Sequence, residues 1–381
     1  MRKFFGILLF MTLIWACSSD DNGVSAPGEE PDPTLGPGEE SFERGPMLAN
    51  WADNIIIPSY EAFAIEIENL NTSFEAFRAD ASTANLSSFR ASWLSTYKAW
   101  QRVSMFEIGP AETEGLRLNV NIYPTDASKI ESHIVSGTYD LSLSSNRDAK
   151  GFPALDYLIN GLGETDDAIV SKFNANDKAA LITYTGAVLQ DMTALSARVL
   201  SEWKQSYRDT FVANDGASAT ASVDRFVNDY IFYYEKFLRA GKMGIPLGVF
   251  SGSVLPEKVE AYHKADVSNE LFLEGLNAAQ DLFNGKHFGK SSSGESLASY
   301  LDALNSVKNG EDLNKLINDQ FNAARTRVEG LSAFRQEIEN NDPPTNMLMA
   351  YDEVQRAVPM LKVDMVSAMS ISIDFVDADG D

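Results

Sequence analysis

The stretch 223–238, VDRFVNDYIFYYEKFL, has helical periodicity and decides the fold class. Its apolar side chains recur at steps of three and four residues, which places them on one face of an α-helix. The face comprises Val223, Phe226, Val227, Tyr230, Ile231, Tyr234 and Leu238. An apolar face of this length is typical of a helix that packs against a protein core.

Three further stretches, 89–103, 181–203 and 347–365, carry the same periodicity. Period-two alternation, the signature of strands, is confined to short runs at 116–122 and 371–373. We therefore predict an all-α fold built from antiparallel helical bundles. The polar segment 214–220 predicts a break between an N-terminal half, residues 46–215, and a C-terminal half, residues 218–381. We expect the two halves to pack together, with short irregular segments at their interface.

Residues 1–17 have the features of a bacterial lipoprotein signal peptide. Arg2 and Lys3 precede an apolar run that ends at Ala16, directly before Cys17. This run is shorter than the ~20 residues that span a bilayer. We predict that Cys17 becomes acylated after export and anchors the chain to lipid of the bacterial outer membrane. Both the inner and the outer face of that membrane stay open as the place of the anchor. An ordinary secreted protein with a free thiol is the alternative.

Residues 18–45 are rich in proline, glycine and glutamate, and the tetrapeptide PGEE occurs at both 27–30 and 37–40. Such a composition cannot bury apolar area, so we predict a disordered stalk. The acidic cluster at 18–21, SSDD, resembles the export tag of Bacteroidetes surface lipoproteins. The formal net charge of the chain, −24, argues against nucleic acid as a partner.

The sequence offers few residues for a metal site. Cys17 is the only cysteine, and the three histidines are His133, His263 and His287. Glu260 and His263 have a spacing that can chelate a metal, but a lone pair of this kind is common by chance. Because zinc sites normally need three or four such ligands, we predict no metal site.

Three irregular segments, 106–126, 151–161 and 239–248, mix glycine and proline with aromatic and charged residues. Such segments at helix ends expose backbone donors and often form binding sites. The motifs YPTDxxxIE at 123–131 and GIPLG at 244–248 resemble those of the imelysin family, which includes imelysin-like peptidases. The resemblance implies an exported, often lipid-anchored, all-helical protein with two bundle-like halves. It also implies a link to iron or haem uptake, and founding members were described as metallopeptidases.

The hallmark motif of that family, GxHxxE, is degenerate in this chain. The aligned stretch keeps Gly151, but Pro153 stands at the histidine position and Asp156 at the glutamate position. Proline has no atom that can bind a metal, and aspartate is one methylene shorter than glutamate. Proline is nevertheless well suited to the first turn of a helix, where its missing N–H is not needed. The resemblance therefore implies the family's local structure without its histidine ligand.

These observations lead to the hypothesis of a non-catalytic, surface-tethered binding lipoprotein with a role in iron or haem uptake. Its partners would be membrane lipid, through acylated Cys17, and an iron or haem uptake receptor. We expect the ligand site to lie between the two halves. The candidate residues are Arg117, Tyr123, Asp126, Glu131, Asp156, Tyr157, Arg239 and Lys242.

Two alternatives stay open. The first is a metal-dependent peptidase with oxygen ligands only, such as Asp156 with Glu131. The second is a structural or adhesive cell-surface protein, which would have a flat surface instead of a pocket between its halves.

Overall fold

The computed structural model describes residues 42–374. The chain divides into two units, 1–41 and 42–381, and every described residue belongs to the second. The predicted signal peptide, Cys17 and nearly all of the predicted stalk lie outside the described residues. The second unit is all-α, as the periodicity predicts, and its described strands are the two-residue β1 (Val307–Lys308) and β2 (Glu311–Asp312).

The first half of this unit is a bundle whose long helices are α2 (Ile57–Ala79), α3 (Thr83–Val103) and α9 (Lys178–Glu202), with α2 packed against both others. Its shorter elements carry the irregular segments. They are α1 (Arg44–Asn50), η1 (Trp51–Ile56), α4 (Pro110–Glu114), α5 (Leu116–Val120), α6 (Ala127–Ser136), η2 (Ser144–Ala149), α7 (Gly151–Asp156), η3 (Tyr157–Gly161), α8 (Asp166–Asn174), η4 (Trp203–Tyr207) and α10 (Arg208–Ala213).

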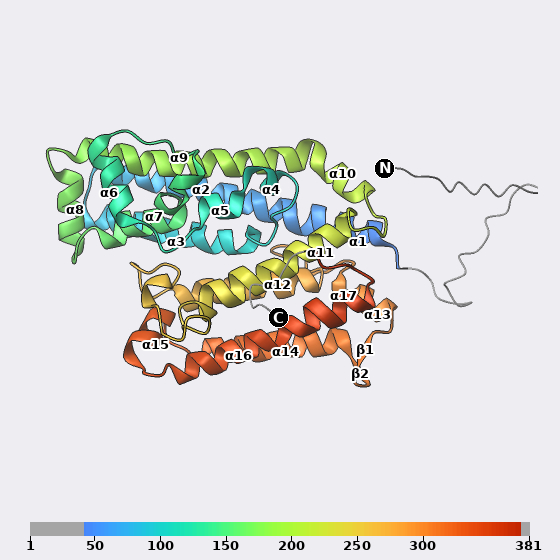
Figure 1. The fold of residues 1–381 in the computed structure, drawn as a ribbon. Helices are drawn as coiled ribbons and strands as arrows, with labels where there is room; N and C mark the ends of the chain where they lie inside the picture. Colours follow the sequence, from blue (N-terminus) through green and yellow to red (C-terminus); the bar gives the residue numbers. More distant parts are fainter. Residues whose placement is uncertain (1–41, 375–381) are drawn as a thin grey trace, which may run out of the picture. The chain divides into compact units, whose positions relative to one another are not determined.

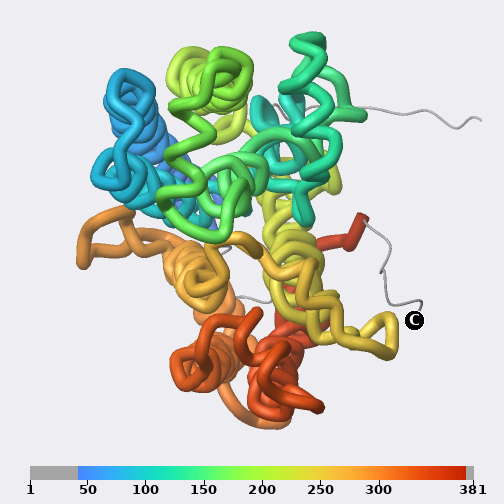
Figure 2. The backbone as a smooth tube through the Cα atoms, turned by 90° about the vertical axis from the view of Figure 1, so that its left-hand side faces the viewer, coloured from blue at the N-terminus to red at the C-terminus, as the bar shows by residue number. Residues whose placement is uncertain are grey.

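The second half begins with α11 (Ser222–Phe232), so the predicted break at 214–220 falls in the connection after α10. Its helices α12 (Ser268–Phe283), α14 (Leu313–Glu329) and α16 (Thr345–Pro359) pack together. In Figure 1 these helices lie below those of the first half, and Figure 2 shows the same two groups from the side. The remaining elements are η5 (Tyr233–Gly244), η6 (Pro256–Lys258), α13 (Leu297–Ala303), α15 (Phe334–Asn340), η7 (Met360–Met365) and α17 (Val366–Ala368).

The stretch 223–238 forms one continuous helical run that changes type. It is α-helical up to Phe232 and π-helical from Tyr233 to Gly244. A π-turn holds more residues than an α-turn, which shifts the buried face along the sequence. Tyr233 and Tyr234 are therefore both buried, although the α-helical periodicity predicts only Tyr234 in the core.

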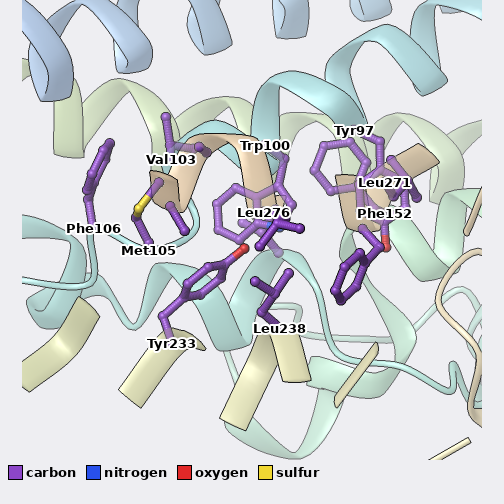
Figure 3. Close-up of a cluster of buried hydrophobic side chains, with 14 of the residues drawn as sticks. Tyr97, Trp100, Val103, Met105, Phe106, Phe152, Tyr233, Leu238, Leu271 and Leu276 are labelled. Atoms are coloured by element: carbon purple, nitrogen blue, oxygen red, sulfur yellow. The ribbon is translucent and has the colours of Figure 1, made fainter. Parts of the chain in front are cut away.

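The two halves share one apolar core. Helix α3 of the first half packs against α12 of the second. Figure 3 shows Trp100 of the first half facing Leu276, Leu238 and Tyr233 of the second, and Phe152 lies to one side, stacked on Tyr97. This contact fixes the position of η5 relative to α3.

Helix α1 begins at Arg44, close to the end of the segment 18–45 that is predicted to be a stalk. The Arg44 guanidinium pairs with Asp224 at 3.2 Å and donates to the Tyr300 hydroxyl at 3.0 Å. Phe42 stacks on the Tyr300 ring, with 4.3 Å between the ring centroids. These contacts hold Phe42 and Arg44 against the second half. Across residues 42–374, no helix has the length and apolar character needed to cross a membrane.

Replacement of Leu276 by alanine tests the shared core. The side chain is fully buried where α12 meets α3, so the variant should lose about 2–5 kcal/mol of unfolding free energy. The matched control is Leu304→Ala, at a side chain that is 42% exposed, for which we expect a change within about 0.5 kcal/mol. Urea unfolding followed by circular dichroism measures both, and equal effects would contradict a shared core at this position.

Candidate functional site

A pocket of about 240 Å³ lies between the two halves. Its wall from the first half contains Tyr123, Pro153 and Asp156, and its wall from the second half contains the segment from Glu257 to His263. The full lining is Tyr123, Pro124, Thr125, Ala127, Pro153, Asp156, Glu257, Val259, Ala261, Tyr262 and His263. The degenerate motif and the YPTD segment therefore meet at one site.

Gly151 explains why helix α7 can approach the preceding segment so closely. Its φ angle is +73°, a conformation that side chains with a Cβ rarely adopt. A Cβ atom at this position would lie 2.0 Å from the backbone oxygen of Val120. Pro153 follows in the first turn of α7, where it costs no hydrogen bond. The glycine and the proline together place Asp156 at the pocket.

Asp156 uses its carboxylate to hold the opposite wall of the pocket. Its two oxygens accept the backbone N–H groups of His263 at 2.8 Å and Lys264 at 2.9 Å. The Asn160 amide donates a further hydrogen bond at 3.0 Å. Burial raises the pKa of Asp156 to about 7, and these hydrogen bonds partly offset the rise. Asp156 thus positions the 263–264 turn, and both of its oxygens are already engaged.

His263 is the histidine of this pocket, and the candidate set missed it. Its ring lies 5.2 Å from that of Tyr157 and makes no hydrogen bond to the part of the chain that the structure describes. Burial, with a smaller contribution from Arg335, lowers the pKa of His263 to about 4. The imidazole is therefore neutral at pH 7 and can accept a hydrogen bond or bind a metal-containing ligand.

The sequence signal for His263 was its spacing of three residues from Glu260. The two side chains nevertheless do not share one face of a helix. Residues 259–264 form a turn, and Ala261 adopts a positive φ of 57°. Glu260 instead points into the protein, where it pairs with Lys242 and accepts from the Asn121 amide at 2.8 Å. Burial lowers the pKa of Lys242, and the charge of Glu260 opposes this change.

Arg117 is a second buried cation with its own partner. Its guanidinium donates to both carboxylate oxygens of Asp229 at 3.1 Å and to the Ser104 carbonyl at 2.7 Å. The guanidinium also lies 4.6 Å from the centre of the Phe237 ring. With Tyr123 and Lys242, Arg117 lines a small interior cavity.

The remaining candidates lie apart from the pocket lining. The Asp126 carboxylate accepts the Lys129 N–H at 2.9 Å and caps helix α6. Tyr157 donates to Glu131 at 2.5 Å, and Glu131 lines a different pocket. Arg239 donates to the Tyr351 hydroxyl at 3.1 Å within the second half. The structure thus brings Tyr123, Asp156 and the motif together, and places Asp126, Glu131 and Arg239 elsewhere.

The donor set at the motif does not fit a bare transition metal. Pro153 supplies no ligand, and the Asp156 carboxylate already accepts three hydrogen bonds. Glu131, the other carboxylate considered for a peptidase, does not line this pocket. Between residues 42 and 374, no group of three or more histidine, cysteine, aspartate or glutamate side chains could hold a metal ion.

Comparison with known proteins identifies a matching sequence family and solved structures of similar fold. The sequence profile of the family described as Imelysin matches residues 56–357. Iron-regulated protein A of Synechococcus elongatus is 21% identical over 159 residues, which is 42% of this chain and 40% of the relative, so the match spans less than half of either protein.

Two crystal structures have the same fold. One is that of a protein described as an iron-regulated protein A precursor from Parabacteroides distasonis, with a TM-score of 0.69 and 15% identity over 86% of this chain and 97% of that one. The other is that of an imelysin-like protein from Psychrobacter arcticum, with a TM-score of 0.67 and 15% identity over 88% and 99% of the two chains.

Replacement of Gly151 by alanine should destabilise the fold at the pocket. Both the positive φ and the contact with Val120 oppose a Cβ, so we expect a loss of about 3 kcal/mol or more. Gly137→Ala is the matched control, because Gly137 has a φ of +63° with nothing within 4 Å of a Cβ, and should lose only about 1 kcal/mol. Chemical unfolding compares the two variants, and equal losses would mean that the Val120 contact is unimportant.

The raised pKa of Asp156 predicts a pH dependence of stability. Between its unfolded pKa of about 4 and its folded pKa of about 7, the folded state binds more protons than the unfolded state. The contribution of Asp156 to the unfolding free energy should therefore fall as pH rises through this range, by up to about 4 kcal/mol. Asp156→Asn removes the titration, so the difference between its pH profile and that of the parent isolates this group. Parallel profiles between pH 4 and pH 7 would refute the assignment.

Proposed function

The chain belongs to the imelysin family, and from this premise we propose that it is an exported, non-catalytic binding protein that acts in iron or haem acquisition. The observation that carries the proposal is the pocket between the two halves. The residues at the family motif line this pocket. Pro153 stands in place of the ligand histidine, and Asp156 accepts hydrogen bonds from backbone N–H groups. A pocket with this lining can hold a ligand, and the described residues contain no group of three or more histidine, cysteine, aspartate or glutamate side chains that could hold a metal ion.

The link to iron comes from relatives. The Synechococcus protein and the Parabacteroides protein are both described as iron-regulated protein A, and the latter as a precursor. In keeping with the predicted lipoprotein signal, the proposal places this chain outside the cytoplasm, tethered to the outer membrane through Cys17. An iron or haem uptake receptor would be its partner there.

The chemistry of the lining suggests which ligands the pocket would accept. Tyr123, Tyr262 and the two prolines supply apolar surface, and Glu257 supplies a carboxylate at the exposed edge. His263 adds one neutral imidazole, the group that most often binds haem iron in proteins. The lining contains no lysine or arginine. A small organic ligand without negative charge suits this lining, and His263 is the imidazole of the lining that could bind the iron of a haem.

The peptidase alternative has less support, because Asp156 and Glu131 line different pockets. The purely structural or adhesive alternative predicts a flat surface between the halves, and the pocket is evidence against it.

A thermal-shift screen of the full chain with haemin, ferric chloride and a set of short peptides tests the proposal. We expect haemin or a peptide to raise the melting temperature by a few degrees when it is present at about 100 times its Kd. Because His263 lines the pocket, His263→Ala should abolish this shift. His287→Ala is the matched control, since His287 lies in a surface turn beside Ser292, and should leave the shift unchanged.

Two results would contradict the proposal. One is the absence of any shift across the screen. The other is peptide cleavage that a chelator blocks and that Asp156→Ala eliminates, because this would restore the peptidase alternative.

A further inference from the structure

Directly behind the pocket lies an interior cavity of about 20 Å³. Tyr123 lines both spaces, so this residue lies between them. The cavity is also lined by Trp100 and Gln101 of α3 in the first half and by Tyr233 and Lys242 of η5 in the second. It therefore lies at the junction of the two bundles.

Two of the side chains that line this cavity each have a buried polar atom without a hydrogen-bond partner among the described residues. These atoms are the indole Nε1 of Trp100 and the hydroxyl of Tyr233, and both side chains are 1% exposed. Figure 3 shows the hydroxyl end of Tyr233 directed toward Trp100 and Leu276. Burial raises the pKa of Tyr233 to about 12, and the nearby Ser104 hydroxyl opposes this rise.

Gly275 provides the room for this hydroxyl. It lies inside helix α12, where glycine is unfavourable relative to alanine. A Cβ atom at Gly275 would lie 2.9 Å from the Tyr233 hydroxyl oxygen and 3.7 Å from the Gln101 side-chain oxygen. The glycine therefore allows two polar groups to approach the same place in an otherwise apolar contact.

The size and the charge balance of the cavity indicate what it holds. A cavity of about 10–15 Å³ is large enough for one water molecule, provided that two to four polar groups surround it. The two charged side chains in the lining are each paired with a carboxylate, Lys242 with Glu260 and Arg117 with Asp229. A neutral guest therefore fits better than an ion, because an ion would add an uncompensated charge.

We infer that this cavity is a binding site for one water molecule, which hydrogen-bonds Trp100 of the first half and Tyr233 of the second and supports the pocket wall at Tyr123. The indole N–H donates to the water oxygen, and the water shares a further hydrogen bond with the tyrosine hydroxyl. The water thereby joins the two bundles through polar groups that would otherwise be buried without partners. The inference does not depend on the identity of the pocket's ligand.

Tyr233→Phe tests the inference in the full chain. If water fills the cavity, loss of the hydroxyl removes one of its partners and should shift the unfolding equilibrium about fivefold toward the unfolded state. If the cavity is dry, the same change removes an unpaired buried hydroxyl and should stabilise the protein. Tyr230→Phe is the matched control, because the Tyr230 hydroxyl donates to the Ala279 carbonyl at 3.1 Å and its loss should destabilise.

A crystal structure of the full chain at a resolution that shows ordered water is the second measurement. We expect one density peak within hydrogen-bond distance of both Trp100 Nε1 and the Tyr233 hydroxyl. An empty cavity, or a Tyr233→Phe variant that is more stable than the parent, would overturn the inference.

Discussion

The apolar contact between α3 and α12 is the constraint on which the rest of the structure depends. Trp100, Phe152 and Leu276 join the two bundles through one core, so the polar groups near that junction are cut off from solvent. A buried charge is tolerated only when it is paired and hydrogen-bonded. Each buried cation of the candidate set meets this condition. Arg117 pairs with Asp229, Arg239 with Glu235, and Lys242 with Glu260.

The π-helical run η5 determines which residues face that junction. With more residues in each turn, it turns Tyr233, Glu235, Arg239 and Lys242 inward, all of them at most 3% exposed. Tyr233 and Lys242 reach the interior cavity beside Tyr123, whereas Arg239 turns toward Tyr351 in the second half. A single irregular helix thus supplies both the polar lining behind the pocket and part of the core of the second bundle.

The sequence predicts the fold class well because helical periodicity is a local property that tertiary packing reinforces. It also singles out Tyr123, Pro153 and Asp156, which lie on short segments next to glycines and prolines and line one pocket. It cannot predict that Arg117 and Lys242 have buried carboxylate partners, since Asp229 and Glu260 are distant in the sequence. His263 escapes prediction for a related reason: the positive φ of Ala261 makes its segment a turn, so spacing along a helix is no guide to its position.

Asp156 has a structural role at this site. Its two carboxylate oxygens accept the backbone N–H groups of His263 and Lys264, and a buried donor left without an acceptor costs about 1–3 kcal/mol. A change that removed these hydrogen bonds would release the 263–264 turn and with it the opposite wall of the pocket. A ligand that contacts His263, Tyr123 and Tyr262 leaves these hydrogen bonds in place. The presence of Asp156 at the motif is thus explained by the shape of the pocket, which its hydrogen bonds maintain.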